Sequence, residues 1–380
     1  MVSHTAVAPE VEGFCEEKKS QAATGRTLRD ETNADLCNLL PLKQKRCLQP
    51  IGAQSGSMRA IGVAWHGDSK HLVSISQAGM VVLWDAVNSC ARQFAHRPLA
   101  SAVAVAPSTD VDETVVAVGG MDNAISLLNL SPNLPKGEQV ERLPAIGTSH
   151  DALISALSFM SKESLVTAGG DGDVRVWSLA KGQTTQVLRG HQKDVVGLAV
   201  GSDASGEEGG KASVASVSLD GTVRIWDLRA NCESHVFQCW PESRSAEAEM
   251  AAVSIFPTGN AVAAGGVDGT VRLFDMRAYA TVAELTAKPV AAPITGIECS
   301  LSGRAIYTSH ADATLGVWEP FGEAGRVHKL VAYRSHDPAR LSLVGLSRAP
   351  DGCALAAAGY DSNVRVYGAK VDPKLAAATK

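Results

Sequence analysis

The sequence lacks the features that mark several classes of protein. No C-x-x-C pair occurs among its eight cysteines, which lie at positions 15, 37, 47, 90, 232, 239, 299 and 353, so we expect neither a zinc site nor a redox site. No apolar run approaches the roughly 20 residues that a membrane-spanning helix needs. The N-terminus shows no secretory signal, so we expect reduced thiols and a cytoplasmic location.

Lipid anchors and nucleic-acid binding also lack support. The first residues, MVSH, are not a myristoylation signal, and the last, AATK, are not a prenylation box. The net charge is −5 with interspersed signs, whereas a nucleic-acid binder more often shows a basic stripe. With 45% hydrophobic and 20% charged residues, the composition is that of a globular protein with enough material for a sizeable core.

One short phrase recurs along the chain. GGVDGTVRLFDMR begins at Gly265, and related phrases occur six more times, each ending on a large residue. These seven anchors are spaced 44 to 49 residues apart and are Trp84, Leu128, Trp177, Trp226, Phe274, Trp318 and Tyr367. Six residues before six of the anchors stands an aspartate: Asp122, Asp171, Asp220, Asp268, Asp312 and Asp361. Only the first repeat differs, with Ala78 in that place.

Each repeat contains several β-patterned runs bounded by turn residues. In the fourth repeat they are residues 195–200, 213–218 and 222–228. A period in the 40s with several strands per unit predicts an all-β, seven-bladed propeller. The aspartate suits a tight turn, and the anchor supplies a large ring between neighbouring blades. A two-sheet sandwich does not explain seven regular anchors.

The chain resembles the WD-repeat family and, within it, the β subunits of heterotrimeric G proteins. The most specific stretch is IFPTGNAVAAGGVDGTVRLFDMRA, residues 255–278, with support from GGMDNAISLLNL at 119–130 and GHQKDVVGL at 190–198. The resemblance covers residues 58–368. It implies a non-enzymatic signalling scaffold without cofactors, whose partners are a Gα subunit, a Gγ-like subunit and effectors. These partners would hold it at the inner face of the plasma membrane.

The resemblance also implies hydrogen-bonded tetrads of His, Ser or Thr, Asp and Trp within blades. Two complete sets occur: His191, Ser216, Asp220 and Trp226, and His150, Thr167, Asp171 and Trp177. In the last repeat His336 aligns, but Ala357 replaces the hydroxyl residue, and we expect the other repeats to lack the histidine. Because these residues recur at blade spacing, a structural role is favoured over a catalytic or metal-binding one.

The propeller is expected over residues 42–370, with a mostly disordered N-terminal arm at 1–41 and a C-terminal tail at 371–380. Within the arm, residues 27–40 predict a short helix that ends at Pro41. That helix either docks alone or recruits a γ-like helix. The segment 42–50 is the candidate outer strand that closes the last blade.

Residues on one propeller rim are candidates for binding Gα in its GDP state. Carried over from the family position by position, they are Arg59, Ile61, Leu99, Ser101, Met121, Asn123, Leu153, Asp194, Glu249 and Tyr360. Aliphatic residues at 61, 99 and 153 replace the family's aromatic ones, and Ser101 replaces a methionine. Since aromatic anchors often dominate interface energies, these changes predict weakened or retargeted binding.

Two short motifs resemble those of proteins with other functions. The endings Trp226–Arg229 and Phe274–Arg277 resemble the x-D-x-R motif by which WD-repeat adaptors dock onto cullin-type ubiquitin ligases, so a substrate receptor is the alternative. The segment GEEGGKAS at 206–213 resembles a phosphate-binding loop, but it has Ser205 in place of the first glycine and Ala212 in place of the magnesium-binding Ser or Thr. We therefore expect no enzymatic activity.

Overall fold

The computed structural model describes residues 42–48, 59–88, 90–95, 99–110, 114–130, 141–142, 150–201, 213–230, 232–240, 249–286, 292–320, 329–330, 333–334 and 342–369. Every helix or strand assigned within these ranges is a β-strand. The chain is therefore all-β where it is described, as the repeat pattern predicts. The expected helix at 27–40, the rest of the arm and the tail at 371–380 lie outside the described residues.

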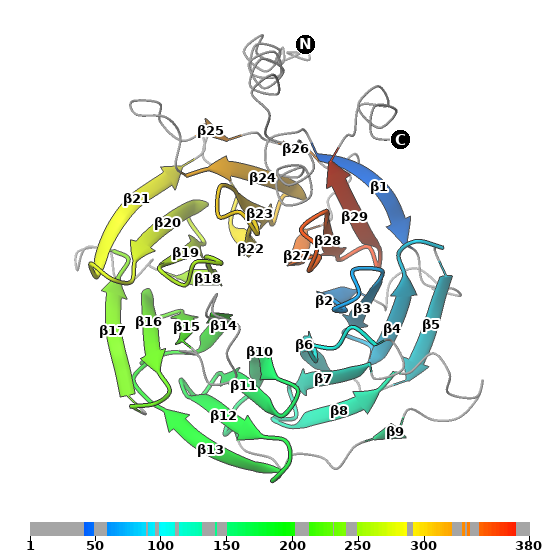
Figure 1. The fold of residues 1–380 in the computed structure, drawn as a ribbon, viewed down its shortest axis with the longest axis horizontal. Coiled ribbons are helices and arrows are strands. Elements are labelled where there is room, and N and C mark those ends of the chain that lie inside the picture. The colour runs from blue at the N-terminus through cyan, green and yellow to red at the C-terminus, as the bar shows by residue number, and fades with distance from the viewer. Residues whose placement is uncertain are drawn as a thin grey trace, which may run out of the picture.

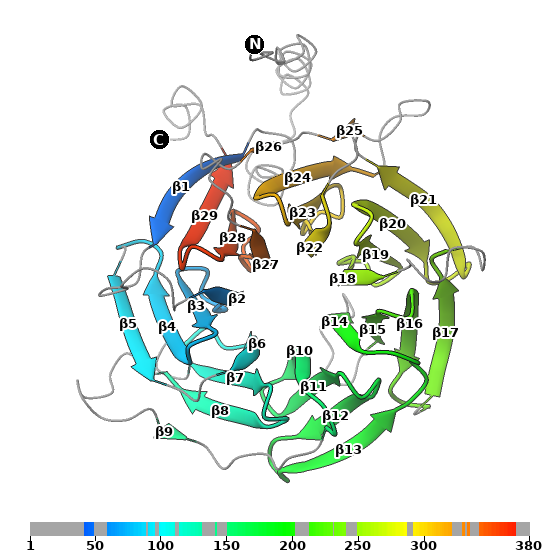
Figure 2. The same cartoon turned by 180° about the vertical axis from the view of Figure 1, so that it is seen from behind.

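The strands form seven antiparallel sheets arranged as blades around a ring, shown from both sides in Figures 1 and 2. The innermost strands are β2 (Ala60–Trp65), β6 (Ala100–Val105), β10 (Ile154–Ser161), β14 (Val195–Gly201), β18 (Met250–Ile255), β22 (Ile294–Cys299) and β27 (Leu343–Arg348). The second strands are β3 (His71–Ser76), β7 (Val115–Gly120), β11 (Ser164–Gly169), β15 (Ser213–Ser218), β19 (Ala261–Gly266), β23 (Ile306–His310) and β28 (Ala354–Gly359).

The third strands carry the anchor residues. They are β4 (Met80–Asp85), β8 (Ile125–Asn129), β12 (Val174–Ser178), β16 (Thr222–Asp227), β20 (Thr270–Asp275), β24 (Thr314–Glu319) and β29 (Val364–Ala369). The outer strands are β5 (Cys90–Ala95), β9 (Glu141–Arg142), β13 (Gln183–Leu188), β17 (Cys232–Gln238), β21 (Ala280–Thr286), the short pair β25 (Lys329–Leu330) and β26 (Tyr333–Arg334), and β1 (Leu42–Leu48). We number the blades in chain order, so blade 1 is β2–β5 and blade 7 is β27–β29 with β1.

The ring closes between the two ends of the described chain. β1 pairs antiparallel with β29, from Leu42 opposite Ala369 to Leu48 opposite Val364, and Figure 1 shows the two strands side by side in blue and red. The predicted closing strand is thus confirmed. It covers the outer edge of β29, which would otherwise present unpaired backbone groups.

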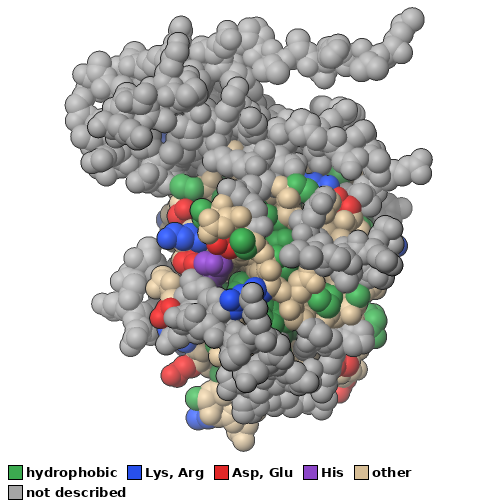
Figure 3. Space-filling view, turned by 90° about the vertical axis from the view of Figure 1, so that its right-hand side faces the viewer, with side chains coloured by type: hydrophobic (Ala, Val, Ile, Leu, Met, Phe, Trp, Pro, Cys, Tyr) green, Lys and Arg blue, Asp and Glu red, His purple; other side chains and the backbone are tan. Residues whose placement is uncertain are grey.

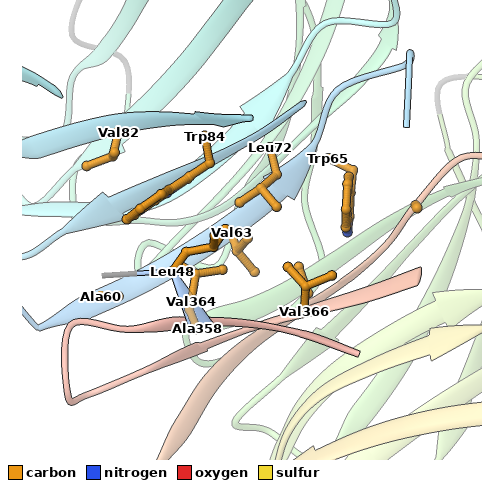
Figure 4. Packing of buried hydrophobic residues seen from close by; sticks show 12 residues of the cluster. Leu48, Ala60, Val63, Trp65, Leu72, Val82, Trp84, Ala358, Val364 and Val366 are labelled. Carbon is orange, nitrogen blue, oxygen red and sulfur yellow. The ribbon is translucent and has the colours of Figure 1, made fainter. Parts of the chain in front are cut away.

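Each space between neighbouring blades is filled by its own hydrophobic cluster, and there are seven such clusters in the described residues. Each anchor lies in the cluster that its blade shares with the preceding one. Trp84, for example, packs with Val364 and Val366 of blade 7 (Figure 4), and Tyr367 packs with Leu315 and Val317 of blade 6. The anchors are at most 3% exposed, so the recurring large residue is what joins one blade to the next.

The aspartates shape the turn between the second and third strands. In all six repeats that have one, its carboxylate accepts the backbone N–H two residues later, at 2.9 to 3.3 Å. The residue directly after each aspartate has a positive φ, including Asn123, Ala313 and Ser362. In blade 1 the Ser76 hydroxyl accepts the Met80 N–H at 3.1 Å instead, which explains how the turn tolerates Ala78.

Candidate functional site

One face of the ring is built from a single backbone bond repeated in every blade. The turn between the second and third strands donates an N–H to the carbonyl of the residue that precedes the innermost strand. The donor and acceptor pairs are Gln77–Arg59, Met121–Leu99, Gly170–Leu153, Leu219–Asp194, Val267–Glu249, Ala311–Pro293 and Tyr360–Ser342, at 2.9 to 3.1 Å. We call the face formed by these fourteen residues the upper rim.

The structure places most of the sequence-predicted binding residues on this rim. Five of them precede innermost strands, namely Arg59, Leu99, Leu153, Asp194 and Glu249, and two lie in the paired turns, namely Met121 and Tyr360. Asn123 lies two residues beyond Met121 in the blade 2 turn. Ile61 and Ser101 are the second residues of β2 and β6 and are partly exposed, as are Asn123, Leu153 and Asp194.

Exposed apolar side chains concentrate on the upper rim. Of the seven large hydrophobic residues exposed in the described part of the chain, four are rim residues: Leu99, Met121, Val267 and Tyr360. Arg59 lies over the Tyr360 ring at 5.6 Å from its centroid, a favourable cation–π geometry. Tyr360, Arg59, Leu99 and Met121 belong to the consecutive blades 7, 1 and 2, so they form one arc.

Acidic side chains continue the rim beyond this arc. Exposed Asp151 belongs to blade 3, Asp194 to blade 4 and exposed Glu249 to blade 5. Exposed Asp122 lies next to Met121 within the apolar arc, and exposed Lys193 and Val267 lie among the acidic residues of blades 4 and 5, so the two kinds of side chain overlap on the rim. Acidic and basic side chains are also interspersed on the outer wall on the side of β5 (Figure 3).

Beneath the rim, the four side chains of both predicted tetrads meet. In blade 3, His150 Nδ1 lies 2.9 Å from an Asp171 oxygen, His150 Nε2 lies 2.8 Å from Thr167 Oγ1, and the Trp177 indole donates to Thr167 at 3.0 Å. In blade 4 the corresponding distances are 3.1, 2.7 and 2.8 Å. Because the carboxylate only accepts, Nδ1 carries the imidazole proton in each set.

The pKa shifts in these networks follow from burial and from hydrogen bonds within each blade. Burial lowers the pKa of His150, although Asp171 opposes the shift, so this imidazole is neutral at physiological pH. Burial would raise the pKa of Asp220, but hydrogen bonds from His191 and Thr222 hold it below its usual range. Each polar side chain of the two tetrads has a hydrogen-bond partner inside its own blade.

Blade 6 has a network that sequence reasoning missed. His310 Nε2 lies 2.9 Å from Thr308 Oγ1, its Nδ1 lies 2.9 Å from the Ala292 carbonyl, and Trp318 donates to Thr308 at 2.9 Å. His310 takes the place that Gly169 has in blade 3, where a Cβ would lie 2.4 Å from His150. The histidine thus enters the same space from β23. A threonine two residues before a histidine on the second strand, here Thr308 and His310, is the sequence pattern that indicates this network.

An arginine four residues after the aspartate pairs with it in blades 3, 5 and 7. Arg272 pairs with Asp268 at 2.8 Å and lies 4.1 Å from the centre of the Trp240 ring. In blade 7, Arg365 pairs with Asp361. Arg175, also four residues after its aspartate, pairs with Asp171 at 3.3 Å in the blade that contains His150, so this arginine accompanies the histidine in that blade rather than replacing it. His336 lies outside the described residues, as does His96, which precedes Leu99 by the same three residues that separate His150 from Leu153.

The two x-D-x-R endings form self-contained turns. Asp227 accepts the Arg229 N–H at 2.9 Å and its guanidinium at 3.2 Å, and Asp275 accepts the Arg277 N–H at 2.7 Å. Both arginines are more than 60% exposed at their side chains. The turn geometry by itself accounts for the Asp–Arg pairing.

The described residues show neither a metal-binding cluster nor a membrane-spanning helix. They contain no cluster of three or more His, Cys, Asp or Glu side chains placed to hold a metal ion. No helix in this part of the chain has the length and apolar character required to span a membrane.

Comparison with known proteins agrees with the repeat structure. The WD domain, G-beta repeat family matches residues 142–178, 182–227 and 245–275. The chain is similar to the guanine nucleotide-binding protein subunit beta of Oryza sativa subsp. indica, with 27% identity over 84% of the chain and 83% of that protein. It is also similar to subunit beta-5b of Danio rerio, with 29% identity over 86% and 76%, and to the subunit beta of Arabidopsis thaliana, with 28% over 84% and 83%. The chain therefore contains WD repeats and is similar to G protein β subunits, as expected of a divergent, G-protein-β-like WD-repeat protein.

Proposed function

We propose that the chain is a signalling scaffold that binds a Gα subunit in its GDP state through the upper rim. The observation that carries this proposal is the gathering of exposed Leu99, Met121 and Tyr360, with Arg59, on one arc of that rim. Exposed apolar side chains that gather on one face of a folded protein mark an interaction site. The relatives are named guanine nucleotide-binding protein subunits beta, which suggests the class of partner.

The mechanism is recognition by a preformed surface. The seven rim bonds fix the backbone on which the contact residues stand, and the tetrads fix the blades beneath. Such a surface loses little conformational freedom on binding. The nucleotide would be sensed by Gα, whose surface changes between its two states. A Gγ-like subunit, effectors and a location at the inner face of the plasma membrane belong to the same proposal.

The test is a titration of the purified chain with Gα loaded with GDP and then with a non-hydrolysable GTP analogue. Binding with GDP that weakens at least tenfold with the analogue supports the proposal. Equal binding, or none, in the two states contradicts it. A pulldown with a cullin-ligase adaptor then tests the alternative role as a ubiquitin-ligase substrate receptor.

A further inference from the structure

Blade 1 differs from blade 4 at each large polar position around its anchor. The second strands match, with Ser74 and Ser76 in the places of Ser216 and Ser218. Three other positions differ by sequence register: Ala78 stands for Asp220, Val82 for Arg224, and Gly56 for His191. By this register blade 1 keeps the hydroxyls of the tetrad, and the described residues that line them supply no carboxylate, guanidinium or imidazole.

A cavity lies where those groups would pack. It has a volume of about 10 Å³, and its described lining is Ala60, Ser74, Ile75, Ser76, Met80, Val82, Gln93 and Ser362. Figure 4 shows Val82 and Trp84 on the same strand, in the cluster that blade 1 shares with blade 7. A cavity of this size holds about one water molecule.

The hydroxyls in the cavity retain hydrogen-bonding capacity. Ser74 Oγ accepts the Trp84 indole N–H at 2.8 Å, as Ser216 accepts that of Trp226. In blade 4 the same hydroxyl also contacts His191 Nε2 at 2.7 Å. Ser76 Oγ accepts the Met80 N–H, and its own O–H has no acceptor among the described residues, whereas the matching Ser218 donates to the Lys193 carbonyl at 3.1 Å. Both serines are less than 10% exposed, so a missing partner would be costly.

The side chains that line the cavity also limit which kind of molecule can bind there. None of the described lining side chains carries a formal charge, so this part of the lining offers an ion no counter-charge. A water molecule can both donate and accept, and two or more polar partners suffice to hold it. We propose that blade 1 binds one water molecule between Ser74 and Ser76, which replaces the imidazole of the tetrad.

This site would make blade 1 differ from blades 3 and 4 in one respect. Its turn, which carries the rim residue Gln77, would be linked to the anchor through exchangeable solvent rather than through a fixed ring. Gln77 bonds both Arg59 and Leu99 through its backbone, each at 3.0 Å. The water site would therefore lie directly below the apolar arc of the upper rim, whether or not that arc binds Gα.

The test is NMR transfer of magnetisation from water to tryptophan indole protons in the full chain labelled with ¹⁵N-tryptophan. Trp84 is compared with Trp226, because both indoles donate to a buried serine. We expect transfer to Trp84 at least several-fold faster than to Trp226. Equal rates would overturn the proposal.

Two variants locate the source of the transfer. Ser76→Val removes a hydroxyl and fills the cavity, and Val82→Ile adds a methylene group to its wall if the first variant fails to fold. Either should reduce transfer to Trp84 to the level of Trp226. Fast transfer that persists in a folded variant would mean that solvent reaches this indole by another route, and the proposal would be wrong.

Discussion

Leu99 shows at the scale of one residue how the upper rim is set apart from the rest of the fold. Its backbone has a φ of 69°, a left-handed conformation that is unfavourable for leucine, and its side chain is 49% exposed. Neither the strained backbone of Leu99 nor its exposed side chain stabilises the folded state. Such outliers often occur where a side chain serves binding.

Replacing Leu99 by asparagine should therefore stabilise the protein while weakening its binding. Asparagine tolerates a positive φ, so we expect a gain of about 0.5–1 kcal/mol in the free energy of unfolding. Leu153→Asn is the matched control, because Leu153 has the same rim position without a positive φ. Urea denaturation measures both. A loss of stability in Leu99→Asn equal to that in the control would show that the positive φ of Leu99 does not destabilise the fold.

Glu298 is a second residue with a distinct role. A side-chain oxygen at its position in the innermost strand receives a backbone N–H from the next blade, as Ser254 does from Cys299 at 3.2 Å and Ser347 from Trp65 at 3.3 Å. Burial raises the pKa of Glu298 to about 7, while Arg348 opposes the shift through its charge and its backbone N–H. The folded state thus favours the neutral carboxyl.

This raised pKa predicts a pH dependence of stability with a definite sign. The contribution of Glu298 is fully present below its ordinary pKa of 4.5 and is lost as the pH rises through about 7. Glu298→Gln should therefore gain about 2 kcal/mol over the natural chain between pH 5 and pH 8. Denaturant titrations of both proteins at the two pH values measure it. A constant difference between them would refute the assignment.

At the scale of elements, β1 determines whether the ring is complete. Deleting residues 1–48 removes this strand, exposes the edge of β29 and takes Leu48 out of the cluster between blades 7 and 1. We expect insoluble or aggregated protein. Deleting residues 1–41 keeps the strand, so this control should remain monodisperse in size-exclusion chromatography. A well-folded product from the longer deletion would show that closure does not depend on β1.

The strands were predictable to different degrees for physical reasons. The three runs predicted in the fourth repeat, 195–200, 213–218 and 222–228, match β14, β15 and β16 to within one residue, because these strands are largely buried and bounded by turns. Outer strands such as β13, with the sequence QTTQVL, are mostly polar and partly exposed, so no hydrophobic pattern marks them. The His310 network was missed because this histidine enters from a strand rather than from the preceding loop.

At the scale of the whole molecule, the repeat unit predicts where the rim lies but not which side chains come together on it. Anchors at regular spacing place seven equivalent turns on one face. Nothing in that spacing shows that Tyr360 of the last blade lies beside Arg59 of the first, because that contact exists only once the ring has closed. The joining of the apolar arc across blades 7, 1 and 2 is therefore a property of the closed ring.

The central claim is that the upper rim is the binding face, and one measurement tests it most directly. The affinity of Gα loaded with GDP is compared for the natural chain, for Leu99→Asp with Met121→Asp, and for Val87→Asp with Val282→Asp. The control pair lies off the rim and is equally exposed, at 54% and 53% against 49% and 51%. We predict a loss of at least about 100-fold for the rim pair, as for hot-spot residues, and none for the control. Equal losses, or a loss only in the control pair, would contradict the claim.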